Sequence, residues 1–95
     1  MSSNLRPDAI DLAILCELHN AARRANSAAI LLTTESREMA RKRAQLQFDL
    51  AFRDFVRAYE RLSASLRYKY EPLSARMVLL RIDPGYFRSR GERAA

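Results

Sequence analysis

Cys16 and His19 are the only cysteine and the only histidine of this 95-residue chain. Their spacing would place them on neighbouring turns of one helix, and a histidine beside a cysteine can activate the thiol as a nucleophile. Both lie in an apolar stretch, however, and the sequence offers no third group to orient the imidazole. A zinc site needs four ligands, of which this pair supplies two. We therefore expect a buried Cys16 and a half-buried His19, with no catalytic or metal-binding role.

Other catalytic patterns are missing from the sequence. Neither Gly85 nor Gly91 follows a strand or opens a helix, so there is no glycine-rich phosphate loop. Carboxylates are interleaved with arginines at helical spacing, as in Asp49 with Arg53, which is typical of solvated ion pairs. We therefore expect a protein that is not an enzyme and needs no cofactor.

The residues that indicate a function are basic. The chain has 17 Lys+Arg against 11 Asp+Glu, a formal net charge of +6, and its only lysines are Lys42 and Lys69. Arginine pairs with phosphate and carboxylate through parallel hydrogen bonds, although a GC-rich genome is a competing explanation for so many arginines. Residues 1–34 carry three basic and three acidic side chains, whereas residues 35–70 carry nine against five. The excess charge belongs to the second half of the chain.

Two groups of residues are candidates for binding an anionic partner. The first follows the expected start of a second helix, where cations oppose the helix dipole, and we expect two arginines of the first helix to face it across a hairpin. The second alternates cations with tyrosines, a pattern that can hold phosphates and stack on bases. The competing interpretations are a solvated charged face and tyrosines that pack inside the protein. The candidate residues are Arg23, Arg24, Arg37, Arg41, Lys42, Arg43, Arg67, Tyr68, Lys69 and Tyr70.

Two apolar patterns must position these side chains. Each repeats at spacings of 4, 3, 4, 3 and 4 residues, from Ile14 to Leu32 and from Phe48 to Leu66. Continuing the first pattern leaves it two residues out of phase with the second, about 200° around a helix. The sequence therefore predicts an all-α antiparallel helical hairpin of residues 8–32 and 35–70. The alternative is one bent helix.

The break between the two helices is predicted at residues 33–36, with Thr34 as the N-cap of the second helix. In that hairpin, small residues on the first helix face large aromatic residues on the second. We expect Ala25 and Ala28 to face Ala40 and Ala44 near the turn. Farther from the turn, we expect Ala21, Leu18 and Ile14 to meet Phe48, Phe52 and Phe55.

Pro72 favours the first turn of a short third helix over residues 72–82, with Leu73, Met77 and Leu80 on one face. An extended segment over residues 77–82 is the alternative. Residues 83–86 read as a type II turn, with proline and glycine at its two central positions. The prediction is thus one helical domain over residues 1–85 and a basic flexible tail over residues 86–95.

The apolar residues Leu12, Leu15 and Cys16 of the first helix need cover, and a hairpin this small buries little by itself. We therefore expect a homo-oligomer, a dimer or larger, assembled as a helical bundle. No apolar run is long enough to cross a membrane, no secretory signal is evident, and a single cysteine suits a reducing compartment, so we expect a cytoplasmic protein.

The function expected from these features is a non-enzymatic helical binding protein. Its arginine clusters would engage nucleic acid or a phosphorylated nucleotide, mainly by neutralising phosphates. The alternative is a protein–protein adaptor or inhibitor, of the kind found among phage and plasmid accessory proteins. It would dock on an acidic protein through the apolar face of the first helix and the arginines of the second.

Overall fold

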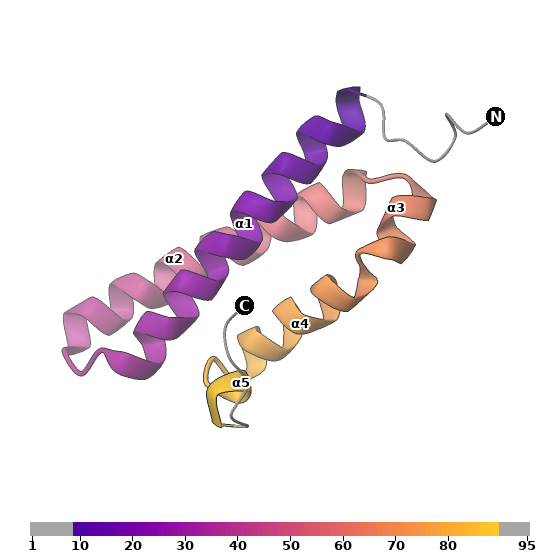
Figure 1. The fold of residues 1–95 in the computed structure, drawn as a ribbon. Coiled ribbons are helices and arrows are strands. Elements are labelled where there is room, and N and C mark those ends of the chain that lie inside the picture. The colour runs from indigo at the N-terminus through magenta and orange to yellow at the C-terminus, as the bar shows by residue number, and fades with distance from the viewer. Residues whose placement is uncertain (1–8, 90–95) are drawn as a thin grey trace.

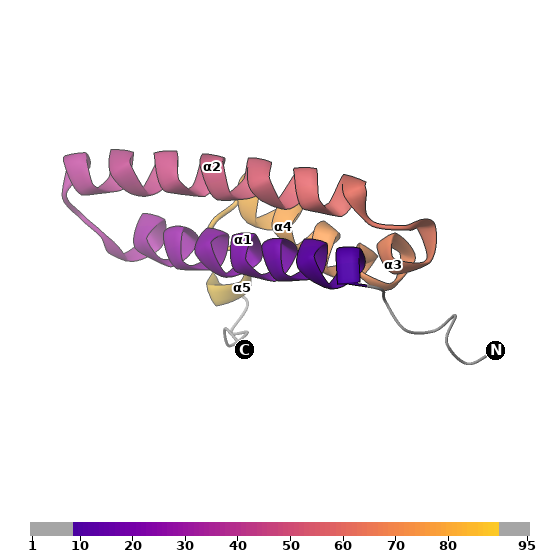
Figure 2. The ribbon, with the colours of Figure 1, turned by 90° about the horizontal axis from the view of Figure 1, so that it is seen from above.

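The computed structural model describes residues 9–89, and all of its regular structure in that range is helical (Figures 1 and 2). Two long antiparallel helices form a hairpin, and the remaining chain runs back along one side of it. In chain order the helices are α1 (Ala9–Thr34), α2 (Glu38–Arg61), α3 (Ala64–Lys69), α4 (Glu71–Ile82) and α5 (Tyr86–Ser89). The predicted fold class is confirmed: the chain forms a helical hairpin with a short further helix, and α1 and α2 are separate helices.

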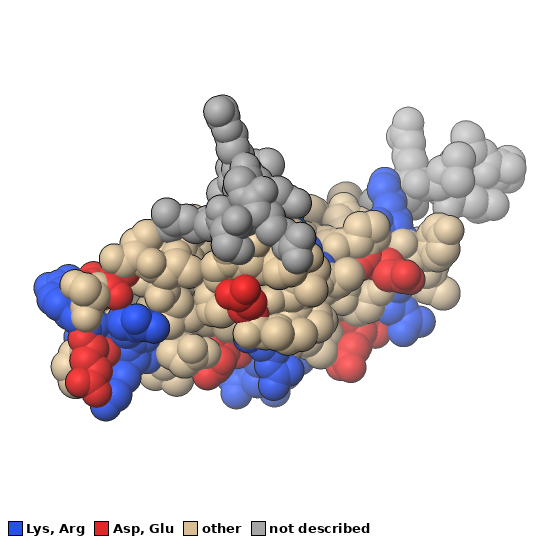
Figure 3. All heavy atoms as spheres, turned by 90° about the horizontal axis from the view of Figure 1, so that it is seen from below, with Lys and Arg blue, Asp and Glu red and all other residues tan. Residues whose placement is uncertain are grey.

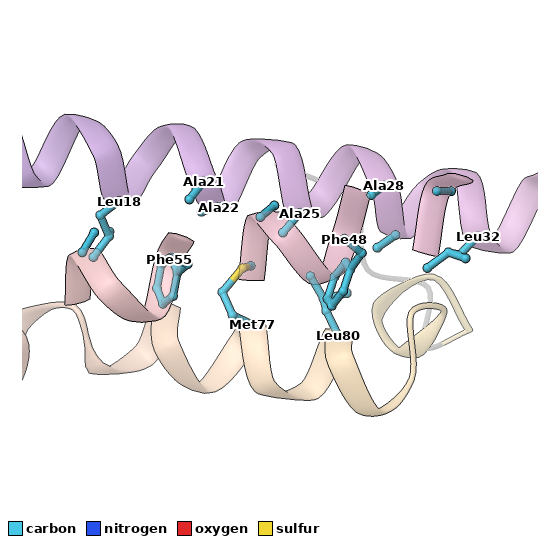
Figure 4. Packing of buried hydrophobic residues seen from close by; sticks show 14 of the residues in the cluster. Leu18, Ala21, Ala22, Ala25, Ala28, Leu32, Phe48, Phe55, Met77 and Leu80 are labelled. Atoms are coloured by element: carbon cyan, nitrogen blue, oxygen red, sulfur yellow. The ribbon is translucent and has the colours of Figure 1, made fainter. Parts of the chain in front are cut away.

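The hairpin is held by small residues of α1 packed against aromatic residues of α2. Ala21 and Ala25 are fully buried, and so are Phe48 and Phe55 (Figure 4). An alanine on one helix lets the backbones approach closely enough for a phenylalanine of the other to fill the space between them. Small residues of α1 and aromatic residues of α2 therefore form the centre of the core, as the sequence predicts in general terms, although it predicts alanines rather than phenylalanines opposite Ala25.

Helix α4 covers one side of this hairpin. Met77 and Leu80 are buried in the same core cluster as Phe48 and Phe55 (Figure 4). Leu73 is half-buried and packs against that cluster. The predicted apolar face of this segment is confirmed, and the segment is a helix rather than an extended strand. Pro72 lies in its first turn, where no hydrogen bond from the proline nitrogen is needed.

The turn between α1 and α2 lies slightly later than predicted. Thr34 still belongs to α1, and its hydroxyl donates to the Ile30 carbonyl at 2.9 Å, so it does not cap α2. The residue at the N-cap position is Arg37, whose side chain makes no capping bond. Instead, the Glu35 carboxylate accepts the Arg37 N–H at 3.1 Å. A carboxylate from the turn has replaced the hydroxyl as the group that satisfies this backbone donor.

The prediction of one helix over residues 35–70 is wrong beyond Arg61. Leu62 and Ser63 are extended, with ψ of 151° and 160°, and the chain bends there before α3 (Figure 2). No glycine or proline marks the bend. Leu62 is buried at it, and the Tyr59 hydroxyl donates across it to the Arg67 carbonyl at 3.0 Å. These tertiary contacts offset the helical hydrogen bonds that the bend interrupts.

The turn before α5 forms at residues 83–86, but it is not type II. The Tyr86 N–H donates to the Asp83 carbonyl at 3.0 Å, while Gly85 lacks the positive φ that a type II turn requires. The Gly85 N–H donates to the Asp83 carboxylate at 3.0 Å. A Cβ on Gly85 would lie 3.3 Å from Cγ2 of Thr33, so the glycine allows the turn to pack closely on the end of α1.

The folded part of the chain continues past the predicted boundary at residue 85. Helix α5 follows the turn, and Phe87 packs half-buried against the core, with the Arg76 guanidinium carbon 3.7 Å from its ring centroid. The start of the predicted tail is therefore structured. The rest of that tail, residues 90–95, lies outside the described residues. None of the helices described combines the length and apolarity that crossing a membrane requires.

The close approach of α1 and α2 can be tested at Ala25. We expect Ala25→Leu to lower the free energy of unfolding by about 1–3 kcal/mol, because the added atoms have no space beside the buried phenylalanines. Urea unfolding followed by circular dichroism measures the change. Ala13→Leu, at an exposed position of the same helix, is the control and should change it by less than about 0.5 kcal/mol. Equal effects of the two substitutions would contradict the packing described for the hairpin.

Candidate functional site

The basic residues at the α1–α2 turn are partly neutralised by acidic neighbours. The Arg37 guanidinium donates to both carboxylate oxygens of Glu35, at 2.9 and 3.1 Å, and Lys42 lies 3.4 Å from Glu38. Figure 3 shows basic and acidic side chains side by side at the end of the molecule that carries this turn. Half of the predicted turn cluster therefore already has a carboxylate partner within the chain.

The side-chain hydrogen bond from Arg37, together with the backbone N–H of the same residue, lowers the pKa of the Glu35 carboxyl from 4.5 to about 2. Glu35 is thus ionised throughout the neutral range. Because its folded-state pKa lies below the ordinary value, the stability that the pair contributes is complete above pH 4.5. It is lost as the pH falls through about 2.

A hollow remains beside this pair, at the start of α2. We call it the turn hollow. Its volume is about 410 Å³, and it is lined by Leu32, Ser36, Glu38, Arg41, Lys42 and Gln45. Arg41 has no ion-pair partner among the described side chains, and the uncapped N-terminus of α2 adds partial positive charge to this end of the molecule. The turn hollow therefore combines a free guanidinium with a hydroxyl and an amide.

The structure does not gather the first candidate group into one patch. Arg43 lies two residues after Arg41, about 200° around α2, so the two side chains leave the helix on opposite sides. Arg24 pairs with Asp54 at 3.3 Å. Asp54 lies about 16 Å from Arg43 along the axis of α2. The expectation that Arg24 faces the turn cluster across the hairpin is therefore wrong. The register of the hairpin places it farther from the turn.

Arg23 and Arg24 instead line a groove between α1 and α2. This groove has a volume of about 770 Å³ and is lined by Asn20, Arg23, Arg24, Ser27, Ala28, Leu31, Gln47 and Leu50. No residue of α4 lines it, because α4 lies on the other side of the hairpin, where Arg81 sits over the Phe52 ring. We call this groove and its continuation the open groove.

The continuation is a second hollow of about 340 Å³ that shares Asn20 and Arg24 with the first. It is lined by Glu17, Asn20, Arg24, Asp54, Arg57, Ala58 and Arg61. Arg61 donates to Glu17 at 2.8 Å, and Arg24 donates to Asp54 at 3.3 Å. Four arginines and two carboxylates therefore line the whole groove, and it keeps an excess of positive charge.

The sequence indicated part of the open groove without locating it. Leu50 belongs to a set of residues, with Met39 and Leu46, that continues the apolar phase of the first helix into the second, and all three are exposed. Arg57 and Arg61 are four residues apart, so they lie on one face of the second helix. Only the register of the hairpin brings them beside Asn20 and Arg24.

The second candidate group is divided between two environments. Tyr68 is 80% exposed on α3. Tyr70 is half-buried, its hydroxyl lies 3.2 Å from Nε2 of His19, and the two rings meet edge to face with centroids 5.3 Å apart. Arg67 and Lys69 are exposed in the last turn of α3, where cations suit the helix dipole. Tyr70 therefore joins α1 to the start of α4, and stacking on a base is open to Tyr68.

The predicted interface residues of α1 differ from one another in their exposure to solvent. Leu12 is 53% exposed, and Cys16 is exposed as well, so the expectation of a buried thiol is wrong. Leu15 is half-buried and packs against the chain's own core. Leu15 lies on the side of α1 that packs against the core, whereas the described residues do not cover Leu12 and Cys16. Within residues 9–89, no three metal-ligating side chains of His, Cys, Asp or Glu come together.

Comparison of the chain with protein-family models, curated proteins and solved structures finds no significant match. The assignment of function therefore depends on the side chains and their geometry.

The ion pair at the turn can be tested by titration. We expect Arg37→Ala to raise the pKa of the Glu35 carboxyl from about 2 toward 4.5, because the side-chain hydrogen bond that favours the ionised form is removed. The carboxyl ¹³C chemical shift of Glu35 followed against pH by NMR measures it. Arg43→Ala removes a nearby cation that makes no contact with Glu35 and should leave the pKa low. A pKa that stays near 2 in Arg37→Ala would contradict the assignment.

Proposed function

We propose that this protein is a non-enzymatic helical binding module that engages a phosphate-bearing partner at the turn hollow. Nucleic acid is the first candidate partner, and a phosphorylated nucleotide is the second. The observation that carries the proposal is the position of Arg41, which has no ion-pair partner among the described side chains and shares a hollow with Lys42, Ser36 and Gln45. The Arg41 guanidinium and the Ser36 hydroxyl offer donors to a phosphate. Lys42 lies 3.4 Å from Glu38 and the Gln45 amide donates to Asp49 at 2.9 Å, so these two groups add only the N–H groups that remain.

Two further features support the same site. The N-terminus of α2 has no side-chain cap, so its free backbone N–H groups and the helix dipole favour an anion nearby. The hollow of about 410 Å³ is open to solvent, so a phosphate of an extended nucleic acid chain can reach it. Glu38, which also lines it, is already paired with Lys42. No base-reading pattern is evident, so we expect affinity for phosphates with little sequence preference.

The proposal predicts salt-dependent binding of nucleic acid that depends on Arg41. A labelled single-stranded RNA should bind, and its affinity should fall steeply between about 50 and 200 mM salt, because bound phosphates release counterions. Arg41→Glu should weaken the binding at least about tenfold and reduce the salt slope by about one or two. Fluorescence anisotropy across the salt series measures both quantities.

Arg53→Glu is the matched control for Arg41→Glu. It carries the same charge change at an exposed position of the same helix but lies outside the turn hollow. Equal loss of affinity in the two variants would reduce the effect to net charge and contradict a site at Arg41. Absence of RNA binding at low salt, together with absence of binding to a labelled nucleoside triphosphate, would overturn the proposed function.

A second function, that of a protein–protein adaptor or inhibitor, is favoured by a different observation. Leucines lie exposed on surfaces that the described part of the chain does not cover, among them Leu12 on α1 and Leu50 on α2. Apolar groups of this kind contribute to protein interfaces and little to phosphate binding. An acidic protein is the expected partner because the chain carries a formal net charge of +6.

We also propose that the protein forms a homodimer or larger bundle through the outer side of α1. Residues 1–34 carry equal numbers of basic and acidic side chains, so two copies of α1 can approach without like-charge repulsion. Leu12→Glu should convert the oligomer to a monomer in size-exclusion chromatography with light scattering, because burying a carboxylate in an apolar contact is costly. Val78→Glu, at an exposed position of α4, is the control. A wild-type protein that is monomeric at tens of micromolar would contradict this prediction.

A further inference from the structure

The open groove has apolar walls near its turn end. Leu31 of α1 is 43% exposed, and Leu46 and Leu50 of α2 are 60% and 41% exposed. Leu31 and Leu50 line the groove directly, together with Ala28, and Leu46 lies one helical turn from Leu50 on the same side of α2. Leucines that gather along one groove, rather than being scattered singly, mark a surface that binds another protein.

The two sides of the hairpin differ in what covers them. On one side, α4 inserts Met77 and Leu80 into the core between α1 and α2. On the other side, α1 and α2 form the open groove, whose larger part has a volume of about 770 Å³, and no other described helix enters it. A groove between two parallel ridges of side chains is the shape that receives an amphipathic helix, through apolar residues spaced three or four apart.

The charges along the groove decide which helix fits. Arg23 and Arg57 have no ion-pair partner among the described side chains. Arg24 and Arg61 each pair with one carboxylate, that of Asp54 and that of Glu17. A second copy of this chain would bring the same excess of arginine, and a two-fold pairing with its axis along the groove would set Arg23 and Arg57 against their own copies. A nucleic acid would pair with the arginines but leave the leucines exposed to water. The complementary partner therefore carries carboxylates beside an apolar stripe.

We propose that the open groove docks an amphipathic helix of an acidic protein. Apolar side chains of that helix fill the space between Leu31 and Leu50, and its flanking carboxylates pair with Arg23 and Arg57. This inference rests on the adaptor function and is independent of phosphate binding at the turn hollow.

The test uses two synthetic helical peptides with identical leucine heptads, one flanked by glutamates and the other by lysines. The glutamate peptide should bind to the full chain, and the lysine peptide should bind at least about tenfold more weakly. Leu50→Gln and Arg23→Glu should each weaken binding of the glutamate peptide about tenfold. Val78→Gln, which changes an exposed apolar residue of α4, should leave it unchanged. Isothermal titration calorimetry gives the affinities, and circular dichroism confirms that each variant is folded.

Each of four results would overturn the proposal. The glutamate peptide fails to bind, or it binds equally well to Leu50→Gln. Alternatively, Leu50→Gln dissociates an oligomer of the wild-type chain, which assigns the groove to a second copy. In the fourth case, single-stranded RNA binding is lost in Arg23→Glu and kept in Leu50→Gln, which assigns the groove to nucleic acid.

The same measurements separate this inference from the function on which it rests. If the glutamate peptide binds and the binding requires Leu12 but not Leu50, the adaptor function stands and the groove assignment fails. If the glutamate peptide binds neither at Leu12 nor at the open groove, the adaptor function and the groove assignment both fail. Phosphate binding at the turn hollow is tested by Arg41→Glu, which changes no residue of the open groove.

Discussion

The contact between alanines of α1 and phenylalanines of α2 is the constraint from which the rest of this structure follows. Ala21 and Ala25 leave no side chain beyond the β-carbon, so the two helices approach closely and Phe48 and Phe55 fill the space that remains. A chain of this size forms one small core, and the alanine–phenylalanine contacts lie at its centre. The register of the hairpin is thereby fixed, because shifting one helix by a turn would separate the large residues from the small ones.

The register determines which charged side chains meet. It places Arg24 beside Asp54 and Arg61 beside Glu17, residues that lie 30 and 44 positions apart in the chain. Such exposed ion pairs contribute little to stability, at most about 1 kcal/mol each. These ion pairs instead determine where positive charge remains in the groove. They occupy Asp54 and Glu17, so Arg23 and Arg57 are left without a carboxylate among the described side chains.

The path of the chain after α2 decides which surfaces remain open. The bend at Leu62 and Ser63 sends α4 back along one side of the hairpin, where Met77 and Leu80 complete the core. The other side is left with exposed leucines and arginines, and the turn end is left with a hollow around Arg41. These surfaces carry the proposed functions, and their exposed leucines and arginines lie outside the buried core.

The sequence by itself determined the hairpin of two long helices and most of its core. Heptad spacing predicted two long helices, their antiparallel pairing and the apolar face of Leu73, Met77 and Leu80, because periodicity reports which side of a helix is buried. It did not predict the bend at Leu62, which no glycine or proline marks and which tertiary contacts stabilise.

For the functional surface, the sequence supplied only the list of basic residues. The tertiary structure decided that Arg37 pairs with Glu35, that Tyr70 packs on His19, and that Arg41 and Arg24 belong to different sites. A site of this kind depends on how two helices are placed side by side. Spacing along one helix fixes the face on which each residue lies, and only the packing of the hairpin fixes what faces it.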